Sequence, residues 1–229
     1  MTIKLGWNDG HTLEGAGTGA QKIIKETDRN RRIGNKVKSI LKNEYIVDII
    51  DCTINKSSND MRDAVNKANN AKCDVFISNH VNAGGGVGFE GFYSRYAKQN
   101  DIAKGKIIYD ELVKTKSCLA ARRYCSDYSY KKFDLYVLKN TTMPAFLFEI
   151  GFVDNQKCIN AINEDEVARA YVNGIVKAYN IKKKATTPPA TNTGSNKLYK
   201  VQVGAFSNKS NAEKLKKELE SKGYKPFIV

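Results

Sequence analysis

The sequence is poor in several residue types, and each shortage excludes a class of protein. Only two histidines and one tryptophan occur among 229 residues. No apolar run approaches the ~20 residues that a membrane-spanning helix needs, and residues 1–5 lack the apolar stretch of a signal peptide. We therefore expect a soluble protein without a membrane span, synthesised in the cytoplasm without a signal peptide.

Cysteine is also scarce and irregularly placed. The five cysteines are odd in number, and none of them form a CxxC pair. A disulfide framework and a cysteine-rich zinc site are both disfavoured by this pattern, so we expect reduced, structural thiols.

The charge is strongly unbalanced. A net charge of +14 predicts attraction to a polyanion, which leaves nucleic acid, a membrane surface and an anionic cell wall open. The lysines are spread along the chain, and the only compact basic runs are Arg122-Arg123 and residues 182–184. A generally basic surface fits this spread better than a DNA-reading module, and no nucleic-acid recognition motif is present.

Strand-like and helix-like segments alternate along most of the chain. Strands are expected at residues 2–7, 44–51, 73–78, 89–94, 134–138 and 145–149, and helices at 26–41, 61–71, 97–115, 155–162 and 165–179. The connections are long enough for parallel pairing. This order predicts an α/β fold with a mostly parallel, twisted sheet and helices on both faces.

The composition changes after residue 181. Residues 182–196 are rich in Lys, Pro, Thr, Asn and Gly without apolar periodicity, which predicts a linker after a folded domain at 1–181. Residues 197–229 then predict a small βαβ segment, with a strand at 199–203, a helix at 208–223 and a strand beginning at 226. A segment of this size buries little core, so it is interpreted as half of a module.

Four side chains that can bind a metal ion or transfer a proton are expected at one edge of the sheet. His11 and His80 follow the first and third strands, and Glu149 ends the last strand, so all three belong at the carboxyl ends of parallel strands. Glu26, at the start of the first helix, faces the same edge. Two histidines and a carboxylate match a catalytic zinc site with one open position, and a further carboxylate suits a general base. The alternative is two surface histidines and ordinary acids, with Glu149 pointing to solvent or paired with a lysine.

Several short motifs occur in a recognisable order. They are Asp9-Gly10-His11, Glu26, Met61-Arg62 with Ala68-Asn69, Ser78 to Ala83, Gly88 to Tyr93, and Pro144 to Asn155. With these motifs, residues 2–180 resemble the zinc-dependent N-acetylmuramoyl-L-alanine amidases of the amidase-3 type. Two positions depart from that pattern: Asn8-Asp9 replaces a usual proline, and Cys52-Thr53 stands where an arginine is often found.

The resemblance implies a role for each matched position. His11, Glu26 and His80 would bind one Zn²⁺, Glu149 would be the catalytic acid and base, and Asn82 is a candidate substrate-binding residue. The implied reaction is hydrolysis of the amide between the muramic lactyl group and L-alanine in peptidoglycan.

The tail carries a second resemblance. Tyr199 to Phe206, followed by Asn211-Ala212, is similar to the first half of a SPOR domain, a peptidoglycan-binding module. Together the two parts predict an enzyme that lyses the bacterial cell wall after its release from the cytoplasm, with peptidoglycan and anionic wall polymers as partners. A phage endolysin and a sporulation enzyme that lyses the mother cell both fit, and the tail favours the second. A wall-binding protein with an inactive catalytic domain is the alternative.

Overall fold

The computed structural model describes residues 2–15, 17–185 and 202–228 of the chain. It divides into two compact units, Met1–Ala185 and Thr186–Val229. Each unit is described by itself. The exact limits expected from the sequence, 1–181, 182–196 and 197–229, stay a prediction.

The first unit is built on a six-stranded sheet in the order β2-β1-β3-β6-β4-β5. The strands are β1 (Ile3–Asp9), β2 (Val47–Asp51), β3 (Val75–Asn82), β4 (Phe89–Tyr93), β5 (Ala121–Ser126) and β6 (Ala145–Phe152). Strand β1 pairs in parallel with β2 and β3, β3 with β6, and β4 with β5. Only the β4–β6 pairing is antiparallel among the described strands. The mostly parallel sheet expected from the sequence is confirmed.

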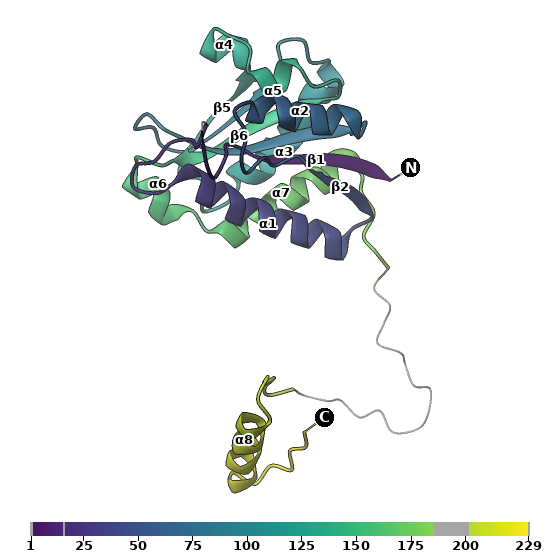
Figure 1. Ribbon diagram of the computed structural model, residues 1–229, viewed down its shortest axis with the longest axis vertical. Coiled ribbons are helices and arrows are strands. Elements are labelled where there is room, and N and C mark those ends of the chain that lie inside the picture. Colours follow the sequence, from purple (N-terminus) through teal and green to yellow (C-terminus); the bar gives the residue numbers. More distant parts are fainter. Residues whose placement is uncertain (1, 16, 186–201, 229) are drawn as a thin grey trace. The chain divides into compact units, whose positions relative to one another are not determined.

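Helices cover both faces of this sheet, as expected (Figure 1). The helices are α1 (Glu26–Glu44), α2 (Asp60–Asn70), α3 (Gln99–Val113), α4 (Asp127–Lys131), α5 (Tyr136–Lys139), α6 (Gln156–Ala161), α7 (Glu164–Tyr179) and, in the second unit, α8 (Lys209–Ser221). Among the helices that the structure describes, none is both long enough and apolar enough to cross a membrane.

Alternation along β6 separates two cores. Phe146 and Phe148 are buried in the larger core, to which α1, α3 and α7 contribute. Leu147 points the other way, into a smaller core shared with α2 and α5. Because side chains alternate between the faces of a strand, Glu149 lies on the same face as Leu147. The candidate site is therefore on the face covered by α2 and α5.

Two elements differ from the sequence-based expectation. The strand expected at 134–138 was wrong: the structure has the single helical turn of α5 there, with the Leu138 and Lys139 N–H groups donating to Leu135 O at 3.0 Å. The fifth strand of the chain is instead β5, in a stretch that the sequence pattern left irregular. A four-residue apolar run does not distinguish a strand from a buried helical turn.

The second unit confirms one of its three expected elements. Helix α8 occupies most of the range 208–223, and the Asn208 side chain caps it by accepting from the Ser210 N–H at 2.9 Å. The strand expected at 199–203 lies mostly outside the described residues, and Gln202 and Val203 are not in a strand. Residues 226–228 form no strand either, so the βαβ expectation was wrong for the part described. A strand needs a hydrogen-bonded partner, and the described tail offers none.

Candidate metal centre

Three potential metal ligands come together at the carboxyl end of the sheet. His11 follows β1, His80 lies in β3, and Glu26 opens α1. One donor atom of each lies within 4.8 Å of the others. Glu26 Oε1 is 3.2 Å from His11 Nε2 and 3.0 Å from His80 Nδ1. The structure thus brings together the three residues that the sequence proposed as a set.

Contacts on the outer side of each ligand fix its orientation. His11 Nδ1 lies 3.1 Å from Gly17 O, and His80 Nε2 lies 3.1 Å from Ser78 Oγ. Each imidazole therefore keeps its other nitrogen toward Glu26. Glu26 itself is fixed from the backbone, because its Oε2 accepts from the Ala20 N–H at 3.0 Å. Such outer contacts are typical of histidines that bind metals.

The electrostatics of the cluster favour an anionic carboxylate between the two imidazoles. Burial alone would raise the pKa of Glu26, but hydrogen bonds with His11 and His80 outweigh it and hold that pKa well below its usual value. Burial also lowers the pKa of His80 and so favours its neutral form, which is the form that binds metals. For His11 burial acts in the same direction, but the hydrogen bond with Glu26 raises its pKa.

Two glycines make room for the histidine rings. A Cβ atom at Gly10 would overlap the His80 ring. At Gly19 the backbone has a φ of +75°, and a Cβ would lie 2.8 Å from His11 Cδ2. The cluster therefore depends on glycine at two loop positions, one for space and one for both space and backbone conformation.

Arg31 holds the backbone that carries His11. Its guanidinium donates to three carbonyl oxygens of consecutive residues, Asp9 O at 2.5 Å, Gly10 O at 3.2 Å and His11 O at 2.6 Å. His11 has a φ of 69°, a left-handed conformation that is uncommon outside glycine. The sequence analysis missed this contact, and no pattern in the sequence signals it.

Glu149 stands next to the three ligands, on the same face of the sheet as His80. It lies opposite His80 in the β3–β6 register and opposite Glu90 in the β6–β4 register. Its Oε2 atom is buried without a hydrogen-bond partner in the described part of the chain. Burial, reinforced by the negative charges of Glu26 and Glu90 and opposed by Lys131, raises the pKa of Glu149 to about 8.

Glu90 is a buried carboxylate to which the sequence analysis assigned no role. Its Oε1 forms ion pairs with Arg122 Nε at 2.8 Å and with Arg123 Nε at 2.9 Å. Its Oε2 accepts from Asn82 Nδ2 at 2.7 Å. Asn82 is thus turned toward Glu90 and does not line the cavity described next. Its role in substrate binding stays a prediction.

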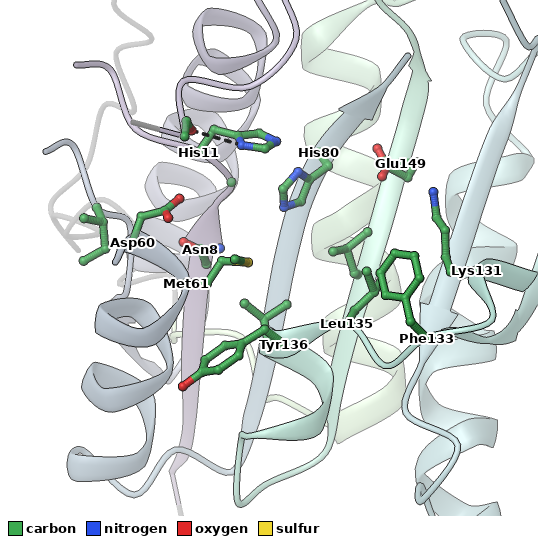
Figure 2. A pocket seen from close by; sticks show the side chains of 15 residues that line it. Asn8, His11, Asp60, Met61, His80, Lys131, Phe133, Leu135, Tyr136 and Glu149 are labelled. Atoms are coloured by element: carbon green, nitrogen blue, oxygen red, sulfur yellow. Dashed lines mark hydrogen bonds between the residues drawn. The ribbon is translucent and has the colours of Figure 1, made fainter. Parts of the chain in front are cut away.

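A cavity of about 340 Å³ is lined by His11, His80 and Glu149 together with several apolar side chains. Figure 2 shows His11, His80 and Glu149 following one another across its floor. The walls come from the start of α2 and from the chain that runs from the end of α4 to the start of α5. They include Asp60, Met61, Lys131, Phe133, Leu135 and Tyr136. The arrangement offers a metal position, an acid–base group and a recess for a partly apolar ligand.

The fold and the site define an α/β protein with a candidate two-histidine, one-carboxylate metal centre. Comparison with known proteins identifies its family. The family model described as N-acetylmuramoyl-L-alanine amidase matches residues 8–180. The chain belongs to this family. A second model, the SPOR domain, matches residues 161–229.

Similar proteins include amidases and a phage endolysin. The chain is 31% identical to a sporulation-specific N-acetylmuramoyl-L-alanine amidase of Bacillus subtilis, over 90% of this chain and 76% of the relative. It is 36% identical to an endolysin of Bacillus phage SPP1, over 80% of this chain and 68% of the relative. Its fold matches the catalytic domain of the amidase CwlV from Bacillus (Paenibacillus) polymyxa, with a TM-score of 0.67 and 23% identity, covering 80% of this chain and all of that domain.

Proposed function

We propose that this protein is a zinc-dependent amidase that hydrolyses the amide between the muramic lactyl group and L-alanine in peptidoglycan. One observation carries the proposal: the donor atoms of His11, Glu26 and His80 lie within 4.8 Å of one another, and Glu149 lies beside His80 in the same cavity. The family supplies the reaction, and the geometry supplies the groups that this reaction needs.

The donor set fits a catalytic zinc ion. Two imidazole nitrogens and one carboxylate oxygen are ligands that zinc takes in hydrolases, with a further position left for water or substrate. The facing atoms are His11 Nε2, His80 Nδ1 and Glu26 Oε1. When bound, zinc would supply a Lewis acid that polarises the scissile carbonyl and acidifies a water molecule.

Glu149 is proposed to move the proton. As a carboxylate it accepts a proton from the water that attacks the amide carbon. It then gives that proton to the alanine nitrogen as the C–N bond breaks, so the carboxylate is regenerated. In the zinc-free protein, burial raises the pKa of Glu149 to about 8, so this carboxyl holds a proton more readily near neutral pH than an exposed glutamate does. The absence of a hydrogen-bond partner for Oε2 among the described residues leaves that oxygen available for the transfer.

The tail is proposed to hold the enzyme on its substrate. A SPOR-like segment that binds peptidoglycan would raise the local concentration of the catalytic unit at the wall. The net charge of +14 suits the same anionic surface. Relatives in both sporulation and phage lysis leave two biological settings for this reaction, and the SPOR-like tail favours sporulation.

Digestion of purified Gram-positive cell walls tests the proposal. We expect new N-terminal alanine without new reducing sugar ends, loss of that product with a zinc chelator, and its recovery when zinc is added back. New reducing ends would instead identify a glycosidase and overturn the zinc assignment. Binding to walls without any new terminus would identify a wall-binding protein with an inactive catalytic unit.

A further inference from the structure

The edge of the cavity beyond Glu149 is formed by residues 127–136, named here the rim segment. Four of its residues, Lys131, Phe133, Leu135 and Tyr136, line the cavity together with Glu149. In Figure 2 Lys131 lies on the opposite side of Glu149 from His80. The positive charge of Lys131 acts on Glu149, because it opposes the increase that burial causes in the pKa of the Glu149 carboxyl. A cation therefore stands next to the proposed reaction centre.

A buried carboxylate, that of Asp127, links the beginning of the rim segment to its end. Asp127 is fully buried, and its side chain accepts from the Tyr128 N–H and from the Leu135 N–H, each at 2.8 Å. The bond to Leu135 joins the two ends of the segment. Lys132, with a φ of 62°, ends α4 in a left-handed conformation directly after Lys131. These contacts hold the position of Lys131 relative to the sheet.

Aromatic packing also restrains the Lys131 side chain. The Tyr130 ring stacks on Phe92, with ring centroids 5.8 Å apart. The Arg123 guanidinium lies 3.5 Å from the Tyr130 centroid. Lys131 Nζ is 5.4 Å from the Tyr130 centroid and 5.7 Å from that of Phe92. A side chain restrained in this way loses less freedom when it binds a ligand.

Lys131 differs from neighbouring cations in forming no direct ion pair among the described residues. Arg122 and Arg123 pair with Glu90, and both Arg95 and Lys139 pair with Asp134. Within the described residues, Lys131 forms no ion pair with a carboxylate. An ammonium held at a cavity edge without a direct ion pair favours an anionic group on the bound ligand.

We propose that Lys131 binds a free carboxylate of the substrate, on the acidic residue that follows the scissile alanine. The assignment rests on the proposed function, because the stem peptide of peptidoglycan supplies that carboxylate. The second stem residue is a glutamate joined through its side chain, so its α-carboxylate is free unless the wall is amidated there. One residue spans ~3.8 Å, which keeps this carboxylate near the cleaved amide. Lys131 would then select walls with the free acid over amidated walls.

The test compares two wall preparations that differ only in amidation of this carboxylate. The initial rate of N-terminal alanine release is measured on each, below saturation, for the full chain with zinc bound. The variants are Lys131→Met, Lys131→Arg and the matched control Lys132→Met. Lys132 is exposed and is not among the cavity-lining residues, so its loss changes the net charge equally without changing the cavity. Melting temperatures check that each variant is folded.

We expect the wild type and Lys132→Met to release alanine about 10 to 100 times faster from free-acid walls, the range for a hydrogen bond between charged groups. Lys131→Met should bring this ratio close to 1, because the larger loss of rate falls on the free-acid walls, and Lys131→Arg should restore much of the ratio. An unchanged ratio in Lys131→Met would overturn the inference. An equal loss on both walls would also overturn it, because Lys131 would then act through Glu149.

Two further outcomes separate this inference from the proposed function. If Lys132→Met lowers the ratio of the two rates as much as Lys131→Met does, the preference for free-acid walls comes from general surface charge. That result would overturn a specific role for Lys131. Release of no N-terminal alanine from either wall by the wild type would overturn the proposed function, and the inference with it.

Discussion

Glu149 and Glu90 occupy directly opposite positions on the antiparallel strands β6 and β4, yet their surroundings differ. Glu90 is bound by Arg122, Arg123 and the Asn82 amide. Glu149 has a buried oxygen without a hydrogen-bond partner in the part of the chain described. Two carboxylates with such different surroundings can serve different purposes, one holding strands together and the other exchanging a proton.

Replacing Glu149 with glutamine should remove activity and keep the metal. The amide has nearly the same shape but accepts no proton, so the rate of alanine release should fall by about 10² to 10⁴. Zinc content, measured by metal analysis, should stay at that of the wild type. Glu14→Gln is the control, because Glu14 is exposed and forms an ion pair with Lys56 at the surface. Loss of zinc in Glu149→Gln would contradict the assignment, because Glu149 would then be a ligand.

The same substitution should change how the stability of the zinc-free protein depends on pH. The pKa of Glu149 is raised by burial from 4.5 to about 8, so the folded state binds the proton more tightly than the unfolded state. This contribution to stability is fully present below pH 4.5 and is lost as the pH rises to about 8, at a slope of at most about 1.4 kcal/mol per pH unit. Denaturant unfolding at several pH values should show a shallower decline for Glu149→Gln. Parallel curves for the two proteins would contradict the raised pKa.

Arg31 should matter for metal affinity although it is not a proposed ligand. Arg31→Met removes the donors that hold the carbonyl oxygens of Asp9, Gly10 and His11, so His11 should lose its fixed position. We expect zinc affinity to fall by about 10- to 100-fold, the usual cost of losing an outer contact. Competition with a fluorescent chelator measures it. Arg32→Met is the control, since Arg32 pairs with Glu164 instead; equal losses in both variants would argue against a specific role.

Gly10→Ala should displace His80. The added methyl group would overlap the imidazole ring, and overpacking of this kind costs about 1–3 kcal/mol. The variant should unfold at lower denaturant concentration, and its melting temperature should rise less when zinc is added. Gly6→Ala, in strand β1, is the control, because its methyl group would come no closer than 3.3 Å to Cys73 Sγ and Phe76 Cδ2. An unchanged response to zinc in Gly10→Ala would show that the ring has room to move.

The sequence predicted the candidate site better than it predicted the surroundings of the site. His11 follows β1, and His80 and Glu149 lie near the carboxyl ends of β3 and β6. These strands are strongly apolar, and parallel pairing brings such positions to one edge. Glu90 was not recognised, because its role depends on Arg122 and Arg123, which lie on a strand that the sequence pattern did not reveal. A strand with two consecutive arginines has no apolar alternation to detect. Its charges are tolerated because a buried acid on the neighbouring strand neutralises them.

The misplaced fifth strand has a related cause. Leu135, Val137 and Leu138 are apolar enough for a strand, but the segment packs into the smaller core as one helical turn. The Leu135 N–H is bound by Asp127, a contact between residues on either side of the loop. Periodicity over so few residues carries no information about such a contact.

The alternation of side chains along β6 also limits which changes in chain length this protein can tolerate. Deleting one residue between Pro144 and Glu149 would turn the acid into the larger core, where Phe148 now packs, and would bring the aromatic ring to the cavity floor. Inserting or deleting two residues would keep Glu149 on the same face of β6 but would move it along the strand by one two-residue repeat. Variation in length during evolution should therefore accumulate in the loops around the cavity, such as the rim segment, while the spacing from Pro144 to Glu149 stays fixed.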